Sequence, residues 1–208
     1  MINNQYTQSV NNAIQQAIEI KALKDEWSLI KKGKYYSVSS RKYKDCQNKL
    51  LKVEGTLPTS YFTACQFYFD NIDTAFPKNR ALCTGIDILE KVDNDTYVCV
   101  IKLAAMANSL PKEVLTVRHR KFISNNEILL VNGVLDEHQK LPRKQDVIRT
   151  EHAIYALYLT KLSATTTHFE LYFLKDPSTS FPEQIFSKLS DVVLNSYEKD
   201  VETLTTKK

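Results

Sequence analysis

Apolar and polar positions alternate with different periods in different parts of the chain. Near the start, apolar side chains recur at helical spacing over residues 8–31, which predicts an N-terminal helix ending before Gly33. A second helical region is expected at residues 59–76, opened by Pro58 and Thr59. The apolar positions of the first helix are Val10, Ile14, Ala17, Ile20, Leu23, Trp27 and Ile30.

The middle of the chain is typical of a sheet. Two short strand-like runs at 35–40 and 48–57 come first, and six more follow one another between residues 83 and 175. Turn-forming residues separate most of these runs, as at 93–95 and 124–126. Because no helix intervenes between the six runs, the pattern predicts an antiparallel meander within a sheet over residues 35–175.

A long amphipathic helix is predicted at residues 182–205. Its apolar side chains form one stripe over more than five turns: Ile185, Phe186, Leu189, Val192, Val193, Tyr197, Val201 and Leu204. The fold class is therefore α+β, with a curved antiparallel sheet of about eight strands closed by this helix. One helix rarely fills the mouth of such a sheet, so we expect an internal cavity, and an apolar cavity with a few polar anchors is a ligand site.

Polar residues inside the predicted strands are candidate anchors. In "DVIRTEHAIYALYL", at 146–159, alternation puts Arg149, Glu151 and Tyr155 on one face, and neither face is purely apolar. Either Arg149 and Glu151 pair with neighbouring strands, or at least one of them faces a ligand. Asn132, within "LLVNGVL", needs partners if it is buried; a ligand, a water or a bulge at Gly133 would each supply them.

Composition narrows the function classes. The 208 residues fit one domain, 1–208, and the net charge of +4 comes without the dense basic stripe of nucleic-acid binders. The four cysteines and four histidines show no metal-ligand spacing, and four glycines leave no phosphate-binding loop. With a polar start and no apolar run of about 20 residues, we expect a cytoplasmic monomer, peripheral to membranes, without metal, cofactor or catalytic residues.

An ordered set of short motifs resembles one family. "IKLAA" (101–105), "PKEVLTVR" (111–118), "VIRTEH" (147–152) and "DPSTSFP" (176–182) resemble the START domains, named for steroidogenic acute regulatory protein-related lipid transfer. The resemblance covers nearly the whole chain and is closest to the sterol-binding branch. It implies a helix-grip fold around a tunnel for one lipid, and non-vesicular lipid carriage without covalent chemistry.

The resemblance also implies site residues. The sterol-binding branch has an acid at the position of Lys102 and an arginine at that of Arg118, near the polar head of the ligand. Two neighbouring cations predict a cationic headgroup region, neutralised by Glu151 or by a ligand phosphate, so the ligand is a phospholipid or a sterol. The expected cavity residues are Lys102, Arg118, Asn132, Arg149, Glu151, Tyr155, Phe186, Leu189, Val193 and Tyr197.

The C-terminal helix is expected to act as a lid over the cavity. The loop at 136–146 is expected at the same mouth, where Lys140, Arg143 and Lys144 would contact anionic headgroups of a transiently bound membrane. Two other functions stay open. One is a protein-interaction module whose cavity is filled by aromatic side chains, and the other is a cyclase-like enzyme on the same scaffold.

Overall fold

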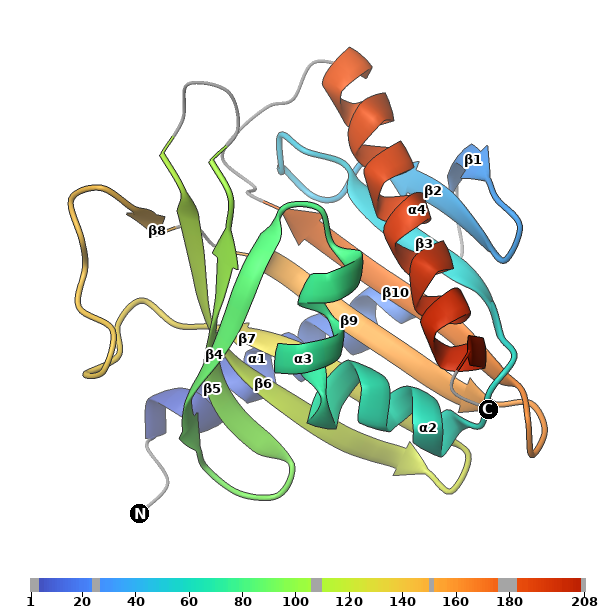
Figure 1. Cartoon of the computed structure of the whole chain (residues 1–208), viewed down its shortest axis with the longest axis horizontal. Helices are drawn as coiled ribbons and strands as arrows, with labels where there is room; N and C mark the ends of the chain where they lie inside the picture. The colour runs from blue at the N-terminus through green and yellow to red at the C-terminus, as the bar shows by residue number, and fades with distance from the viewer. Residues whose placement is uncertain (1–3, 24–26, 106–109, 150–151, 176–182, 207–208) are drawn as a thin grey trace.

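The computed structural model describes residues 4–23, 27–105, 110–149, 152–175 and 183–206, without the side chains of 152, 153, 175, 183–187 and 189. One long antiparallel sheet, which does not close into a barrel, lies between helix α1 on one face and helix α4 on the other (Figure 1). The predicted α+β, helix-grip arrangement is therefore confirmed.

The first helix is shorter than predicted. Helix α1 (Asn4–Lys21) buries the expected stripe from Val10 to Ile20, but residues 28–32 form the edge strand β1 (Ser28–Lys32). Trp27 packs against Tyr172 of the sheet with ring centroids 5.7 Å apart. Trp27, which extends the helical pattern, is thus half-buried against the sheet instead of lying on a helix. Because residues 28–32 form a strand, the prediction of helix up to residue 31 was wrong.

Ten strands form the sheet in the described part of the chain, two more than the approximate expectation. Their order across the sheet is β1-β2-β3-β10-β9-β7-β6-β5-β4, with β8 paired to β6. All pairs are antiparallel except β6 with β8. The remaining bounds are β2 (Tyr36–Arg41), β3 (Leu50–Leu57), β4 (Cys83–Lys91), β5 (Thr96–Leu103), β6 (Lys112–Ser124), β7 (Glu127–Val134), β8 (Ile148–Arg149), β9 (His152–Lys161) and β10 (Thr167–Lys175).

Short helical elements cover the same face as α4. Helix α2 (Tyr61–Cys65), the π-helical turn η1 (Gln66–Asp70), helix α3 (Ile72–Ala75) and the 3-10 turn η2 (Pro77–Asn79) occupy the region predicted at 59–76. Ser60 caps α2, because its Oγ accepts a hydrogen bond from the backbone N–H of Thr63 at 3.1 Å. Helix α4 (Glu183–Thr206) agrees with its predicted bounds within one residue.

Alternation along the strands creates two cores. An inner core lies between the sheet and the elements α2 to α4, and an outer core lies between the sheet and α1. In β6, Val114 belongs to the inner core, whereas Leu115 and Val117 belong to the outer one. The same alternation directs Arg118 to the inner side, opposite Tyr97 of β5 and Asn132 of β7.

Candidate functional site

A cavity of about 140 Å³ lies between the inner face of the sheet and the middle of α4. Most of its walls are apolar, and the polar groups come from η2, β6, β7, β9 and α4. Its lining residues are Ile72, Phe76, Arg80, Ala81, Leu82, Cys83, Ile101, Leu103, Arg118, Asn132, Tyr155, Phe173, Val192, Val193, Ser196 and Tyr197. An apolar chamber with few polar groups has the character of a ligand site.

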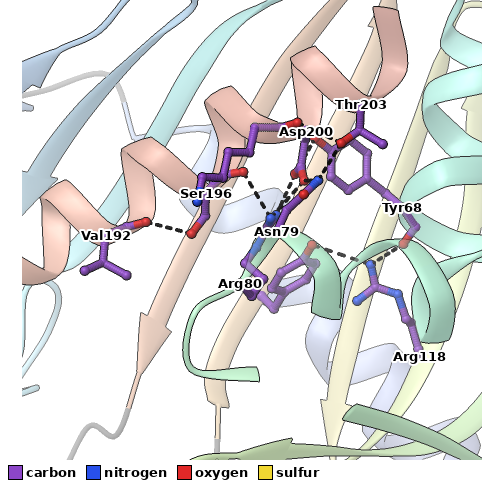
Figure 2. Close-up of polar contacts among 10 residues, drawn as sticks. Tyr68, Asn79, Arg80, Arg118, Val192, Ser196, Asp200 and Thr203 are labelled. Carbon is purple, nitrogen blue, oxygen red and sulfur yellow. Dashed lines mark hydrogen bonds and ion pairs between the residues drawn. The ribbon is translucent and has the colours of Figure 1, made fainter. Parts of the chain in front are cut away.

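Arg118 is the polar group set deepest in this chamber. Arg118 is 1% exposed, and its guanidinium donates to Asn132 Oδ1 at 2.6 Å. It also donates to the carbonyl of Tyr68 at 2.8 Å (Figure 2). A longer contact of 3.5 Å joins Nη2 to the hydroxyl of Tyr155, whose ring lies under the guanidinium with its centroid 4.8 Å away. Every partner named here is neutral.

Some hydrogen-bond donors of Arg118 and Asn132 are unused within the described residues. Arg118 Nε and Asn132 Nδ2 are buried and have no hydrogen-bond partner within the described part of the chain. Among the described residues, Arg118 forms no ion pair with a carboxylate. A buried guanidinium with unused donors favours the approach of an oxygen acceptor, most strongly a charged one.

A second polar group, the Asp200 cluster, joins α4 to the helical segment beside the cavity. It consists of Tyr68, Asn79, Arg80 and Asp200. The carboxylate of Asp200 is fully buried and accepts from Arg80 at 2.6 and 2.9 Å, from Asn79 at 2.8 Å and from Tyr68 at 3.0 Å (Figure 2). Burial, reinforced by the charge of Asp200, raises the pKa of Tyr68 well above its ordinary value, so its hydroxyl stays a donor.

Arg80 extends this attachment into the cavity wall. Its Nη1 also donates to the carbonyl of Ser196 at 3.2 Å, and its guanidinium lies 4.2 Å from the ring of Phe76 and 4.3 Å from that of Tyr197. Asn79 additionally donates to Thr203 Oγ1 at 3.0 Å. These contacts fix the C-terminal half of α4, from Ser196 onward, against η2.

Five of the expected site residues come together at the cavity: Arg118, Asn132, Tyr155, Val193 and Tyr197. The side chains of Phe186 and Leu189 and the whole of Glu151 lie outside the described residues. The positions of these five agree with the predicted cavity, and their role toward a ligand stays a prediction.

Lys102 and Arg149 do not line the cavity, in contrast to the prediction. Lys102 follows Val98 and Val100 on the other face of β5 and forms an exposed ion pair with Asp87. Arg149 pairs with Glu113, at 3.4 Å between Nη2 and Oε2, on the outer face of β6. The expected pair of neighbouring cations, Lys102 and Arg118, is therefore absent because strand alternation directs them to opposite faces.

The loop at 136–146 also lies elsewhere than predicted. It leaves β7 and extends away from α4, on the far side of the molecule (Figure 1). Lys140 and Arg143 line a different hollow, shared with the N-terminal end of α1, and Lys144 is exposed. The basic loop and the C-terminal helix thus do not share one mouth.

Sequence reasoning missed Tyr68, Arg80 and Asp200. One signal was available for Asp200, because it follows Tyr197 by three positions and immediately precedes Val201 within the apolar stripe of α4. An acid in that position predicts a buried partner. Arg80 follows a proline-containing turn and carries no comparable periodic signal.

The described residues contain neither a cluster of metal-ligating side chains nor a membrane-spanning helix. No group of three or more histidine, cysteine, aspartate or glutamate side chains there is arranged to hold a metal ion. No helix in that part of the chain is long and apolar enough to cross a membrane.

Comparison with known proteins assigns the family. The family model described as START domain matches residues 8–201. No curated protein sequence matches. Among solved structures, human StAR-related lipid transfer protein 5 is similar with a TM-score of 0.82 and 16% identity over 97% of both chains.

Two further solved structures have the same fold. Human STARD10 has a TM-score of 0.75 and 14% identity over 93% of this chain and 79% of its own. The STAR-related lipid transfer protein fragment from Xanthomonas axonopodis has a TM-score of 0.74 and 14% identity over 87% and 99%. The likeness at these identities concerns the fold, and the family match extends over most of the sequence. This chain belongs to the START domain family.

Proposed function

We propose that the protein binds one lipid in the cavity between the sheet and α4 and carries it between membranes without covalent chemistry. The observation that carries the proposal is Arg118, a buried guanidinium without a carboxylate partner among the described residues, set in an apolar chamber. Membership of the START domain family supports lipid binding in general. The protein meets membranes from their surface, as a monomer.

The polar groups of the cavity suit binding better than proton transfer. Arg80 and Arg118 are permanent cations, and Asn132 does not titrate. Burial raises the pKa of Tyr197 well above its ordinary value, so this phenol keeps its proton near neutral pH. These groups can hold and orient a ligand oxygen, which supports a carrier over a cyclase-like enzyme.

The ligand that fits Arg118 best carries an anionic head. An unpaired buried cation has an effective desolvation penalty of several kcal/mol, which a phosphate or carboxylate would offset by charge-assisted hydrogen bonds. A sterol hydroxyl is a neutral acceptor and offers a weaker match. We therefore favour a phospholipid over a sterol, with the phosphate near Arg118 and Asn132.

The cavity must enlarge to hold such a ligand. Its volume of about 140 Å³ is below the roughly 300–1,000 Å³ of drug-sized ligand sites. The Asp200 cluster holds α4 at 196–203. We infer that the chamber opens by movement of the N-terminal half of α4, which lies outside this cluster and includes Val192 and Val193 of the cavity wall.

A second function has one observation in its favour. The inner core beside the cavity contains a stack of aromatic rings, with the Phe169 centroid 5.2 Å from those of Tyr36 and Tyr197 and 5.4 Å from that of Tyr68. Such a filled interior is what a protein-interaction module without a ligand would have. This alternative predicts no stoichiometric lipid and no loss of function when the cavity is blocked.

Transfer between vesicles tests the carrier proposal. Donor vesicles contain a fluorescent phospholipid and a quencher, and protein-dependent dequenching on addition of acceptor vesicles is the readout. Arg118→Gln is expected to lower the transfer rate at least tenfold, whereas Lys121→Gln, an exposed residue on the same strand, leaves it unchanged. Absence of transfer by the native protein for both phospholipid and cholesterol probes would reject the proposal.

A further inference from the structure

A second hollow lies on the outer face of the sheet, separate from the cavity beneath α4. It has a volume of about 990 Å³, at the upper end of the usual range for small-molecule sites. Its walls come from the start of α1, the end of β4, the loop at 136–143 and Arg149 of β8. It shares no lining residue with the chamber around Arg118.

Arg149 is the unusual group in this hollow. Its side chain is 10% exposed, yet Nε and Nη1 are buried and have no hydrogen-bond partner among the residues that the structure describes. The remaining nitrogen, Nη2, contacts Glu113 at 3.4 Å and the carbonyl of Leu141 at 3.5 Å. Charge-assisted bonds of this kind are usually about 2.7–2.9 Å long, so Arg149 is only loosely held and keeps most of its donors unused.

Another part of the wall is held by hydrogen bonds among its side chains and backbone. His138, whose side chain is 5% exposed, accepts from the backbone N–H of Lys140 through Nδ1 at 3.2 Å. Its Nε2 therefore carries the proton and donates to Glu90 at 3.1 Å, and Tyr6 donates to the same oxygen. This hydrogen bond from His138 lowers the pKa of Glu90, which stays a carboxylate near neutral pH.

The charges of the hollow define the ligand. Four cations line it, Lys91, Lys140, Arg143 and Arg149, together with three acids, Glu90, Asp136 and Glu137. The cations and the unused donors of Arg149 attract an anionic group, whereas the acids repel a polyanion and accept from hydroxyl or ammonium groups. The match is a small anion that also carries hydrogen-bond donors.

We propose that this hollow is a second binding site, in which Arg149 binds the phosphate or carboxylate of a small hydroxylated compound such as a phosphate monoester. A small turn of the loosely held guanidinium brings Nη1 to the ligand, while Glu113 competes for the same group from behind. If Arg149 binds the ligand, removal of the Glu113 charge should strengthen ligand binding. A purely structural role of Arg149 predicts no such increase, so the Glu113 substitution distinguishes the two roles.

Calorimetric titration of the whole chain with glycerol 3-phosphate at low ionic strength tests the site. Arg149→Gln is expected to weaken binding at least tenfold, and Glu113→Gln to strengthen it several-fold. The matched control Lys121→Gln, which removes an exposed charge outside the hollow, leaves the affinity within twofold. If Arg149→Gln does not fold, Arg149→Lys keeps the charge, loses the planar fork and is expected to bind more weakly.

A second arm of the experiment distinguishes a free anion from a lipid headgroup. In this arm, vesicles with and without phosphatidic acid replace glycerol 3-phosphate. Arg149-dependent binding of the soluble compound supports a free ligand, and Arg149-dependent binding to the vesicles alone supports a lipid headgroup. Binding that is absent in both arms, or unchanged by Arg149 and Glu113 substitutions, overturns the site. Neither result bears on lipid transfer through the Arg118 cavity, which the vesicle transfer assay tests separately.

Discussion

Replacement of Asp200 by asparagine perturbs the attachment of α4 most directly. The carboxylate accepts four hydrogen bonds at 2.6–3.0 Å, and its partner Arg80 has a side chain only 11% exposed. The amide of Asp200→Asn has one acceptor oxygen and turns its NH₂ group toward existing donors. Because Arg80 then stays buried without a counter-charge, we expect a loss of about 3–5 kcal/mol of unfolding free energy.

Urea denaturation followed by circular dichroism measures this loss. The same change corresponds to a fall in Tm of roughly 6–20 °C for a domain of this size. The control is Asp191→Asn on the same helix, where the acid is 43% exposed and pairs with Lys31 at the surface. That ion pair contributes about 0–1 kcal/mol.

The double variant Arg80→Met with Asp200→Leu supplies a further check, because apolar groups replace both buried charges and most of the lost stability should return. A loss below about 1 kcal/mol for Asp200→Asn, or one no larger than that of Asp191→Asn, would refute the buried attachment. Hydrogen exchange in α4 is expected to rise in Asp200→Asn and to stay at its native level in the control.

Three further predictions concern the cavity. Lys102→Glu is expected to leave lipid preference unchanged and stability within about 1 kcal/mol, since Lys102 lies on the outer face; a shift toward cholesterol in a competition assay would contradict this. Arg118→Leu is expected to reduce retained phospholipid more than retained cholesterol, as measured by lipid extraction, and equal losses would argue against a phosphate near Arg118. Val193→Trp fills the cavity and is expected to lower lipid occupancy while costing about 1–3 kcal/mol in a denaturation assay; full occupancy would place the ligand elsewhere.

Periodicity alone was sufficient for the main elements of the fold. Helix α4 follows from its single apolar stripe, and the strands from β4 to β10 follow from short apolar runs that are buried on both faces of the sheet. The helix predicted over residues 28–32 was wrong, because an apolar pair at helical spacing is also compatible with an edge strand. Trp27, just before this strand, packs on the sheet. The parallel pairing of β8 with β6 is encoded by no local pattern in the sequence.

The site was predictable only in part. Asn132 and Tyr155 carry polar groups within strongly apolar strands, which made them candidates, and both line the cavity. Lys102 shares the face of Val98 and Val100, but both faces of this strand are apolar, so the pattern did not show which core that face belongs to, and the family resemblance suggested the ligand. The pairing of Arg80 with Asp200 spans 120 positions and depends on how α4 docks on η2.

Native mass spectrometry of the freshly purified protein tests the central claim most directly. Spraying from a volatile buffer retains a ligand enclosed between the sheet and α4, and dissociation of the selected ion identifies it. The account predicts one phospholipid per chain from more than one expression host, with reduced occupancy in Arg118→Gln and Val193→Trp. A single mass equal to the bare chain, or trace lipid that is unaffected by both substitutions, would contradict it.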